Sequence, residues 1–107
     1  MLFPSDVKSR KEFPVFTGAV MYFPRALAAV SHVSFVGNEQ HNPGEPLHWA
    51  RGKSTDQLDA ALRHIMEYSI GETFDDKGYH VLAQAAWRVL AELELHLEAA
   101  EAAKESK

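Results

Sequence analysis

The side chains best suited to chemistry are concentrated in one polar stretch, residues 37–54. It holds two histidines, two glutamates, a tryptophan, an arginine and a lysine, and almost no aliphatic residues. Such groups bind metal ions, phosphates and nucleobases. Most connections in compact domains have about 4–6 residues, and longer ones without regular structure are often functional. The stretch therefore predicts a functional loop, with an ordered surface crossing as the alternative.

Individual side chains of this stretch suit different parts of a nucleotide. Arg51 and Lys53 precede an expected helix start, where basic residues and the helix N-terminus both favour anions. His41, His48 and Trp49 can stack on a base or hydrogen-bond to it. The Gly-x-x-x-x-Gly-Lys pattern is absent, so the stretch is not a P-loop.

Carboxylates recur along the helix that is expected next. The spacing of Asp56, Asp59, Arg63 and Glu67 places all four on one helix face. This face is either an exposed ladder of ion pairs, Asp59–Arg63–Glu67, or the wall of a metal-binding cleft, since Mg²⁺ requires carboxylate oxygens. His64 lies beside this face, although a single helical histidine is more often packed or capping than a metal ligand.

A second acidic group follows in the turn after that helix. Asp75, Asp76 and His80 lie on a segment that is expected to fold back beside the helix. Asp76 is also a candidate cap for the next helix, and its neighbourhood is a good turn signal. On that next helix, Arg88 is placed either to reach a phosphate or to pair with a carboxylate.

The whole chain limits the classes of function. Its 107 residues predict a single domain, 1–107. A net charge of −4 argues against broad binding to a nucleic-acid polymer, though not against small phosphorylated ligands. No cysteine is present, so no disulfide or thiolate site is possible. There is no membrane-span-length apolar run and no signal-peptide pattern, so we expect a cytoplasmic protein that does not bind membranes.

Helices are predicted to position these groups. The first begins at Pro24, which suits a first helical position, and ends near Gly37. The second starts after Ser54, which forms a capping-box pattern with Gln57, and ends at Gly71. A third runs from about residue 79 to about residue 104. No convincing strand alternation is present, so the predicted fold is all-α, a small bundle of about three main helices.

The two ends of the chain are expected to differ from this bundle. Residues 1–21 contain Pro4 and Pro14, which discourage a helix, yet Phe13 and Phe16 are too apolar for a free tail. We expect an extended arm that packs on the domain or on a neighbouring subunit. Residues 99–107 are expected to form a frayed helical tail. The apolar area is marginal for a monomer, so a homodimer or homotetramer is predicted.

Several short motifs are distributed along nearly the whole chain. They are Tyr22-Phe23-Pro24-Arg25-Ala26-Leu27, Gly37-Asn38-Glu39-Gln40-His41-Asn42-Pro43-Gly44, Leu47-His48-Trp49 with Lys53-Ser54, Arg63-His64, Asp76-x-Gly78-x-His80 and Ala86-Trp87-Arg88. Together they resemble the phage-type dATP/dGTP diphosphohydrolases, N-terminal domain type. The long central motif is specific, whereas Arg-His and Ala-Trp-Arg alone would be weak.

That family looks like a relative of the MazG-like all-α nucleotide pyrophosphohydrolases. These are helical oligomers that use carboxylate-bound Mg²⁺ or Mn²⁺ to split a nucleoside triphosphate into a monophosphate and pyrophosphate. This chain lacks their Glu-Glu-x-x-Glu helix followed by Glu-x-x-Asp. The nearest substitutes are Glu39 and Asp56-x-x-Asp59, so the ligand set is left open.

The resemblance implies metal-dependent hydrolysis of dGTP or dATP, in the host cytoplasm if the chain is phage-encoded. The expected metal ligands are Glu39, Asp59, Glu67 and Asp76. The expected catalytic groups are Glu39, Asp59, His64, Asp76 and His80. The expected substrate contacts are Asn38, His41 and Trp49 for the base, and Arg51, Lys53, Arg63 and Arg88 for the phosphates. The alternative is a non-catalytic phage helical module that binds a nucleotide or a partner.

Overall fold

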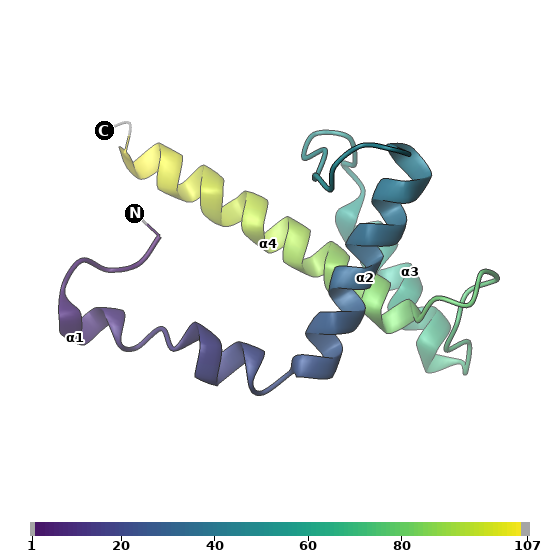
Figure 1. The fold of residues 1–107 in the computed structure, drawn as a ribbon, viewed down its shortest axis with the longest axis horizontal. Coiled ribbons are helices and arrows are strands. Elements are labelled where there is room, and N and C mark those ends of the chain that lie inside the picture. The colour runs from purple at the N-terminus through teal and green to yellow at the C-terminus, as the bar shows by residue number, and fades with distance from the viewer. Residues whose placement is uncertain (1, 106–107) are drawn as a thin grey trace.

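Three helices form the body of the molecule in the computed structural model, which describes residues 2–105. They are α2 (Pro24–His41), α3 (Gln57–Ser69) and α4 (Val81–Glu105). Figure 1 shows α2 crossing α4 near the N-terminal end of α4, with α3 packed beside it. The described residues form no strand, only an isolated bridge between Phe74 and His80. The prediction of a small all-α bundle is confirmed.

Helix α2 begins at Pro24 as predicted, but its predicted end near Gly37 is wrong. The helix continues to His41, so the first five residues of the predicted loop are helical. A glycine inside a helix costs only about 0.5–1 kcal/mol, which one turn of good helix formers can offset. The helix ends at Asn42, which precedes Pro43, because proline disfavours a helical conformation in the residue before it.

Helix α3 differs from prediction at its start and agrees at its end. It begins at Gln57, and no side chain caps it, so the predicted capping box between Ser54 and Gln57 is wrong. At the other end, Gly71 has φ +93°, its N–H donates to Tyr68 O at 3.0 Å, and Glu72 N–H donates to Glu67 O at 2.9 Å. This pattern is a Schellman motif, in which glycine relieves the strain of a left-handed residue.

Small residues form the buried centre of the bundle. Its fully buried apolar side chains are Ala60, Ala61, Val81, Ala85 and Ala91. Alanine faces allow α3 to lie close against α4, because no long side chain separates the backbones. The larger apolar residues of α3 and α4 therefore lie on outer faces, where they are half-exposed or exposed.

The predicted extended arm is wrong for two segments, α1 (Val7–Arg10) and the π-helical turn η1 (Phe16–Val20). The Asp6 carboxylate accepts a hydrogen bond from Ser9 N–H at 2.9 Å, which supplies the cap that α1 needs. The arm projects away from the bundle (Figure 1).

The C-terminal segment is more regular than expected. Instead of fraying from residue 99, α4 continues to Glu105, because its alanine-rich sequence favours helix. Residues 106 and 107 of the expected tail lie outside the described residues. No helix within residues 2–105 combines the length and the apolar character needed to cross a membrane.

Candidate functional site

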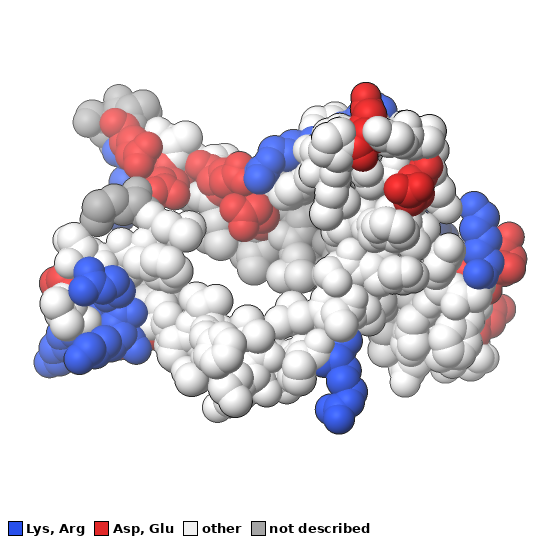
Figure 2. Space-filling view, viewed as in Figure 1, with Lys and Arg blue, Asp and Glu red and all other residues white. Residues whose placement is uncertain are grey.

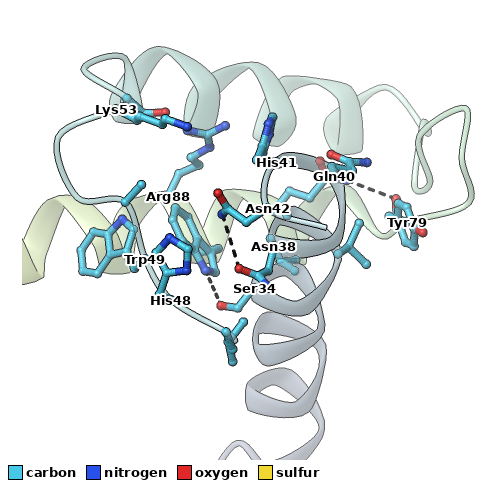
Figure 3. Close-up of a pocket in the computed structure, with 18 of the residues that line it drawn as sticks. Ser34, Asn38, Gln40, His41, Asn42, His48, Trp49, Lys53, Tyr79 and Arg88 are labelled. Atoms are coloured by element: carbon cyan, nitrogen blue, oxygen red, sulfur yellow. Dashed lines mark hydrogen bonds between the residues drawn. The ribbon is translucent and has the colours of Figure 1, made fainter. Parts of the chain in front are cut away.

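A cavity of about 750 Å³ lies where the C-terminal half of α2 meets the following loop and the beginning of α4. Its walls come from selected residues of four segments: the C-terminal half of α2 with Asn42, the following loop, the turn after α3, and the first two turns of α4. Figure 3 shows side chains from α2, the loop and α4 pointing into this space. The cavity is large enough for a small-molecule ligand.

Two tryptophans form an aromatic wall of the cavity. The Trp49 and Trp87 ring centroids are 5.8 Å apart at an interplanar angle of 74°. Trp87 Nε1–H donates to Ser34 Oγ at 2.7 Å, which fixes the Trp87 ring against α2. The Arg51 guanidinium carbon lies over the Trp49 ring, 4.3 Å from its centroid. An aromatic surface held in this way can stack against a nucleobase.

The same cavity has a basic edge. Lys53 and Arg88 both line it, and Figure 3 shows their side chains reaching toward the same part of the space. Arg88 donates to Gln57 Oε1 at 3.1 Å, which orients its guanidinium. Lys53 has no side-chain partner among the described residues. Arginine and lysine together suit phosphate oxygens, arginine through its planar donors and lysine as a point charge.

Two adjacent carboxylates, Asp75 and Asp76, also line the cavity, and they have different environments. Asp75 Oδ1 accepts from Lys77 N–H and Tyr79 N–H, each at 2.9 Å, and its Oδ2 accepts from Gln84 Nε2 at 3.0 Å. Desolvation raises the pKa of Asp75, but the hydrogen bonds from Tyr79, Gln84 and Lys77 lower its pKa overall. Asp75 therefore organises the turn, and it remains charged.

Asp76 is the carboxylate that the cavity leaves available. It lines the cavity and has no hydrogen-bond or ion-pair partner among the described residues. A carboxylate in this state, which lines the same cavity as Lys53 and Arg88, can bind a cation or hold a water molecule.

Asn38 anchors the loop to α2. Its side chain is buried, and its Nδ2 donates to Glu45 O at 3.0 Å. Asn42 Nδ2 lies 3.4 Å from Asn38 Oδ1 (Figure 3). The predicted base contact is therefore also the residue that shapes the loop.

A comparison with protein families matches nearly the whole chain. Residues 8–105 match the family described as dATP/dGTP diphosphohydrolase, N-terminal. The chain belongs to this family. No curated protein and no solved structure matches the chain.

Six of the predicted site residues of this family member line the cavity. They are Asn38, His41, Trp49, Lys53, Asp76 and Arg88. The other seven do not line it: Glu39, Arg51, Asp59, Arg63, His64, Glu67 and His80. Of these, Glu39 is an exposed residue of α2.

Four of the outlying residues belong to α3, three of them on its outer face and the fourth, His64, half-buried beside the buried positions Ala60 and Ala61. Asp59, Arg63 and Glu67 line a shallow groove there. The predicted ion-pair ladder of these three residues is wrong, because Glu67 Oε1 instead lies 2.7 Å from His64 Nδ1. Within residues 2–105, no three Asp, Glu or His side chains converge on a point that could hold a metal ion. Of the four predicted ligands, Glu67 and Asp76 line a second, shallower cavity between the end of α3 and the following turn, whereas Asp59 and Glu39 lie apart from it.

The remaining two outlying residues have structural partners. Arg51 forms an ion pair with Glu98 of α4. Leu82 N–H donates to His80 Nδ1 at 3.1 Å, so His80 caps α4, and the alternative that Asp76 caps this helix is wrong. The His80 ring also stacks on Tyr68, with centroids 6.1 Å apart, which holds the turn against the end of α3.

Sequence reasoning missed the residues that hold the cavity together. Ser34, Gln57 and Glu98 position Trp87, Arg88 and Arg51 respectively. Their separations along the chain, 53, 31 and 47 residues, leave no local signal. Gln84 was detectable, because it lies one helical turn before Arg88 and shares its face.

Proposed function

We propose that the chain hydrolyses the purine deoxynucleoside triphosphates dATP and dGTP to the monophosphate and pyrophosphate. The cavity carries this proposal, since it combines an aromatic wall, Trp49 and Trp87, with a basic edge, Lys53 and Arg88. An aromatic surface suits a base, and a pair of cations suits a polyphosphate. The family description names the same substrates.

In this proposal the base stacks on Trp49, with Asn38 and His41 near its polar edge. Lys53 and Arg88 hold the phosphates, and the Gln57 amide keeps Arg88 in position. Asp76 lines the same cavity as these two cations, and in this proposal its carboxylate orients the attacking water and accepts its proton.

A divalent ion, Mg²⁺ or Mn²⁺, is the proposed cofactor. Mg²⁺ usually keeps several waters and is bound by one or two carboxylates together with substrate phosphates. Asp76 fits this mode, because its carboxylate lines the cavity without a protein partner in the described chain. When bound, the ion would neutralise phosphate charge and lower the pKa of a water.

The test is an assay of the full chain with each of the four common deoxynucleoside triphosphates and either Mg²⁺ or Mn²⁺. Chromatography should find deoxynucleoside monophosphate and pyrophosphate from dATP and dGTP. Reaction in ¹⁸O-labelled water shows which phosphorus the water attacks. The label appears in the monophosphate if the α-phosphorus is attacked and in pyrophosphate if the β-phosphorus is attacked. Release of inorganic triphosphate or of single phosphates would show that another bond is cleaved.

Two carboxylate variants locate the site. Asp76→Asn should reduce the rate about a hundredfold, since several kcal/mol of charge stabilisation are lost. Asp59→Asn is the matched control on the outer face of α3, and it should retain most of the activity. The reverse result would place the reaction in the α3 groove with Arg63 and Glu67.

A nucleotide-binding module without catalysis is the second candidate. It is favoured by the absence of a converging metal-ligand cluster within residues 2–105. The chain has only two tryptophans, and both line the cavity, so their fluorescence reports directly on binding. A fluorescence change with dGTP, without product under any metal condition, would favour the module.

A further inference from the structure

The single chain exposes far more surface than a folded monomer of its size. Its accessible surface is 8366 Å², whereas about 6,000 Å² is expected for 12.0 kDa, an excess of about 2,400 Å². Its radius of gyration is 16.2 Å, against about 13 Å for a compact chain of this length. Much of the apolar surface that a monomer would bury is therefore uncovered.

The N-terminal arm, residues 2–23, contributes much of this uncovered surface. Phe13, Phe16 and Tyr22 are 55%, 65% and 72% exposed. Among the described residues, α1 lies against no other helix, and η1 lies only against α2. Figure 2 shows open space between the arm and α4. A large exposed apolar surface of this kind usually marks a site of contact with another molecule.

The distal half of α4 offers such a surface. Val89, Leu93 and Leu97 follow one another at intervals of four residues, which places them on one helix face. They are 45%, 50% and 54% exposed, although each is a large apolar residue. Neither arm element of the same chain lies against this face.

Charge complements the apolar match. The arm carries Lys8, Arg10 and Lys11 around α1, whereas α4 carries Glu92 and Glu94 on either side of Leu93. In Figure 2 the blue cluster lies over α1 and a red cluster lies over the end of α4. Opposite patches of this kind steer association and set its register.

We propose that the arm of one copy packs on the distal face of α4 in a second copy, and the reverse, to form an arm-exchanged dimer. A two-fold dimer uses both patches of both chains and leaves none open. The excess of about 2,400 Å² per chain is about 4,800 Å² for two chains, which lies within the range of about 2,000–5,000 Å² in total that obligate dimers bury. A second copy is preferred to a lipid surface because the acidic face of α4 complements the basic arm.

This assembly would also reach the cavity. Glu98 lies one turn beyond Glu94 on α4 and forms the ion pair with Arg51, which stacks on Trp49. A second chain covering Leu97 would shield this ion pair from water. The arm of one copy would therefore help to hold the aromatic wall of the other.

Sedimentation equilibrium of the full chain tests the assembly. The mass should be twice 12.0 kDa. Phe16→Glu on the arm or Leu97→Glu on α4 should each give a monomer, because each places a charge in the apolar contact. Leu62→Glu is the matched control, since Leu62 is similarly exposed, at 58%, but lies on α3. Circular dichroism of each variant shows whether its helices are retained.

Crosslinking tests the exchange itself, and the absence of cysteine makes it clean. Phe13→Cys and Leu97→Cys chains, mixed and treated with a bismaleimide, should give a covalent dimer of one chain of each kind. When the Leu97→Cys chain is replaced by a Leu62→Cys chain, this covalent dimer should not form. In the double variant, Phe13→Cys with Leu97→Cys, an internally crosslinked monomer would show that the arm folds on its own α4.

The remaining outcomes overturn the proposal. A wild-type chain that is monomeric at micromolar concentration excludes the dimer. A monomer that pellets with phosphatidylserine vesicles, and loses this binding in Phe16→Glu, would instead assign the arm to a lipid surface. A dimer that survives both Phe16→Glu and Leu97→Glu would place the interface elsewhere on the chain.

Discussion

At the scale of single residues, neighbours in the turn after α3 have separate roles. Asp75 accepts two hydrogen bonds from backbone N–H groups of the turn and one from Gln84 of α4, whereas Asp76 lines the cavity without a partner in the described chain. The two arginines near the cavity also differ, one being available to a ligand and the other held by a carboxylate. Arg88 lines it, and Arg51 is held outside it by Glu98. Variants of each pair should therefore have different consequences.

Asp75→Asn should alter the pH dependence of stability. The pKa of Asp75 in the folded chain lies below its ordinary value of about 3.9. A depressed folded pKa means that Asp75 stabilises the fold above about pH 4 and that this contribution is lost as the pH falls through the folded pKa. Thermal unfolding from pH 3 to 7 should therefore show a smaller rise in Tm for Asp75→Asn than for the wild type.

Arg88→Ala should weaken binding of dGTP about tenfold or more, since a hydrogen bond to a charged group contributes about 1.5–3 kcal/mol. Tryptophan fluorescence titration measures the Kd. Arg51→Ala should have a smaller effect, because Arg51 acts on the ligand only through Trp49. Equal losses in the two variants would mean that Arg51 leaves Glu98 and contacts the phosphates.

At the scale of elements, two glycines have opposite effects on the helices that contain or follow them: one is inside a helix and the other ends one. Gly37 lies inside α2, where a Cβ would meet nothing within 4 Å, whereas Gly71 ends α3 with φ +93°. The helix that passes through Gly37 carries Asn38 and His41 to the cavity. The break at Gly71 turns the chain back toward α4. Both placements are needed to bring α2, the turn and α4 around one space.

The pair Gly37→Ala and Gly71→Ala tests these assignments. Alanine at position 37 should stabilise the helix by about 0.5–1 kcal/mol. Alanine at position 71 should destabilise the fold by about 1–2 kcal/mol, because a side chain disfavours a left-handed backbone. Each kcal/mol corresponds to a change in Tm of about 4–8 °C in a domain of this size. Calorimetry showing changes of the same sign would contradict one of the two assignments.

At the scale of the whole molecule, the buried centre is built almost entirely of alanine. Four of the five fully buried apolar residues are alanines, and the fifth is Val81. Alanine side chains contribute little hydrophobic stabilisation, so close helix contact is achieved with a small buried apolar area. The large apolar side chains, on the arm and on the outer faces of α3 and α4, remain for contacts between chains.

The arm-exchanged dimer predicts that Tm depends on protein concentration. Association that requires the folded chain stabilises it by mass action, so Tm should rise as the concentration is raised from about 1 to 100 μM. Phe16→Glu should remove this dependence, whereas Leu62→Glu should keep it. A wild-type Tm that is constant over this range would contradict an obligate dimer.

The features predicted correctly from the sequence are local ones. Pro24 begins α2 and Gly71 ends α3 because each residue restricts or frees its own backbone. The all-α fold follows from helical periodicity, and the family resemblance, confirmed over residues 8–105, follows from contiguous motifs. Such signals require no knowledge of how the helices pack.

The cavity required the tertiary structure. Gln57 has a capping-box spacing from Ser54, but its side chain is bound instead by Arg88, 31 residues away. Arg51 has the position of a phosphate ligand, but Glu98 holds it outside the cavity wall. These partners meet only because α2 and α3 both pack on α4, and the sequence spacing within one helix carries no information about where a second helix crosses it.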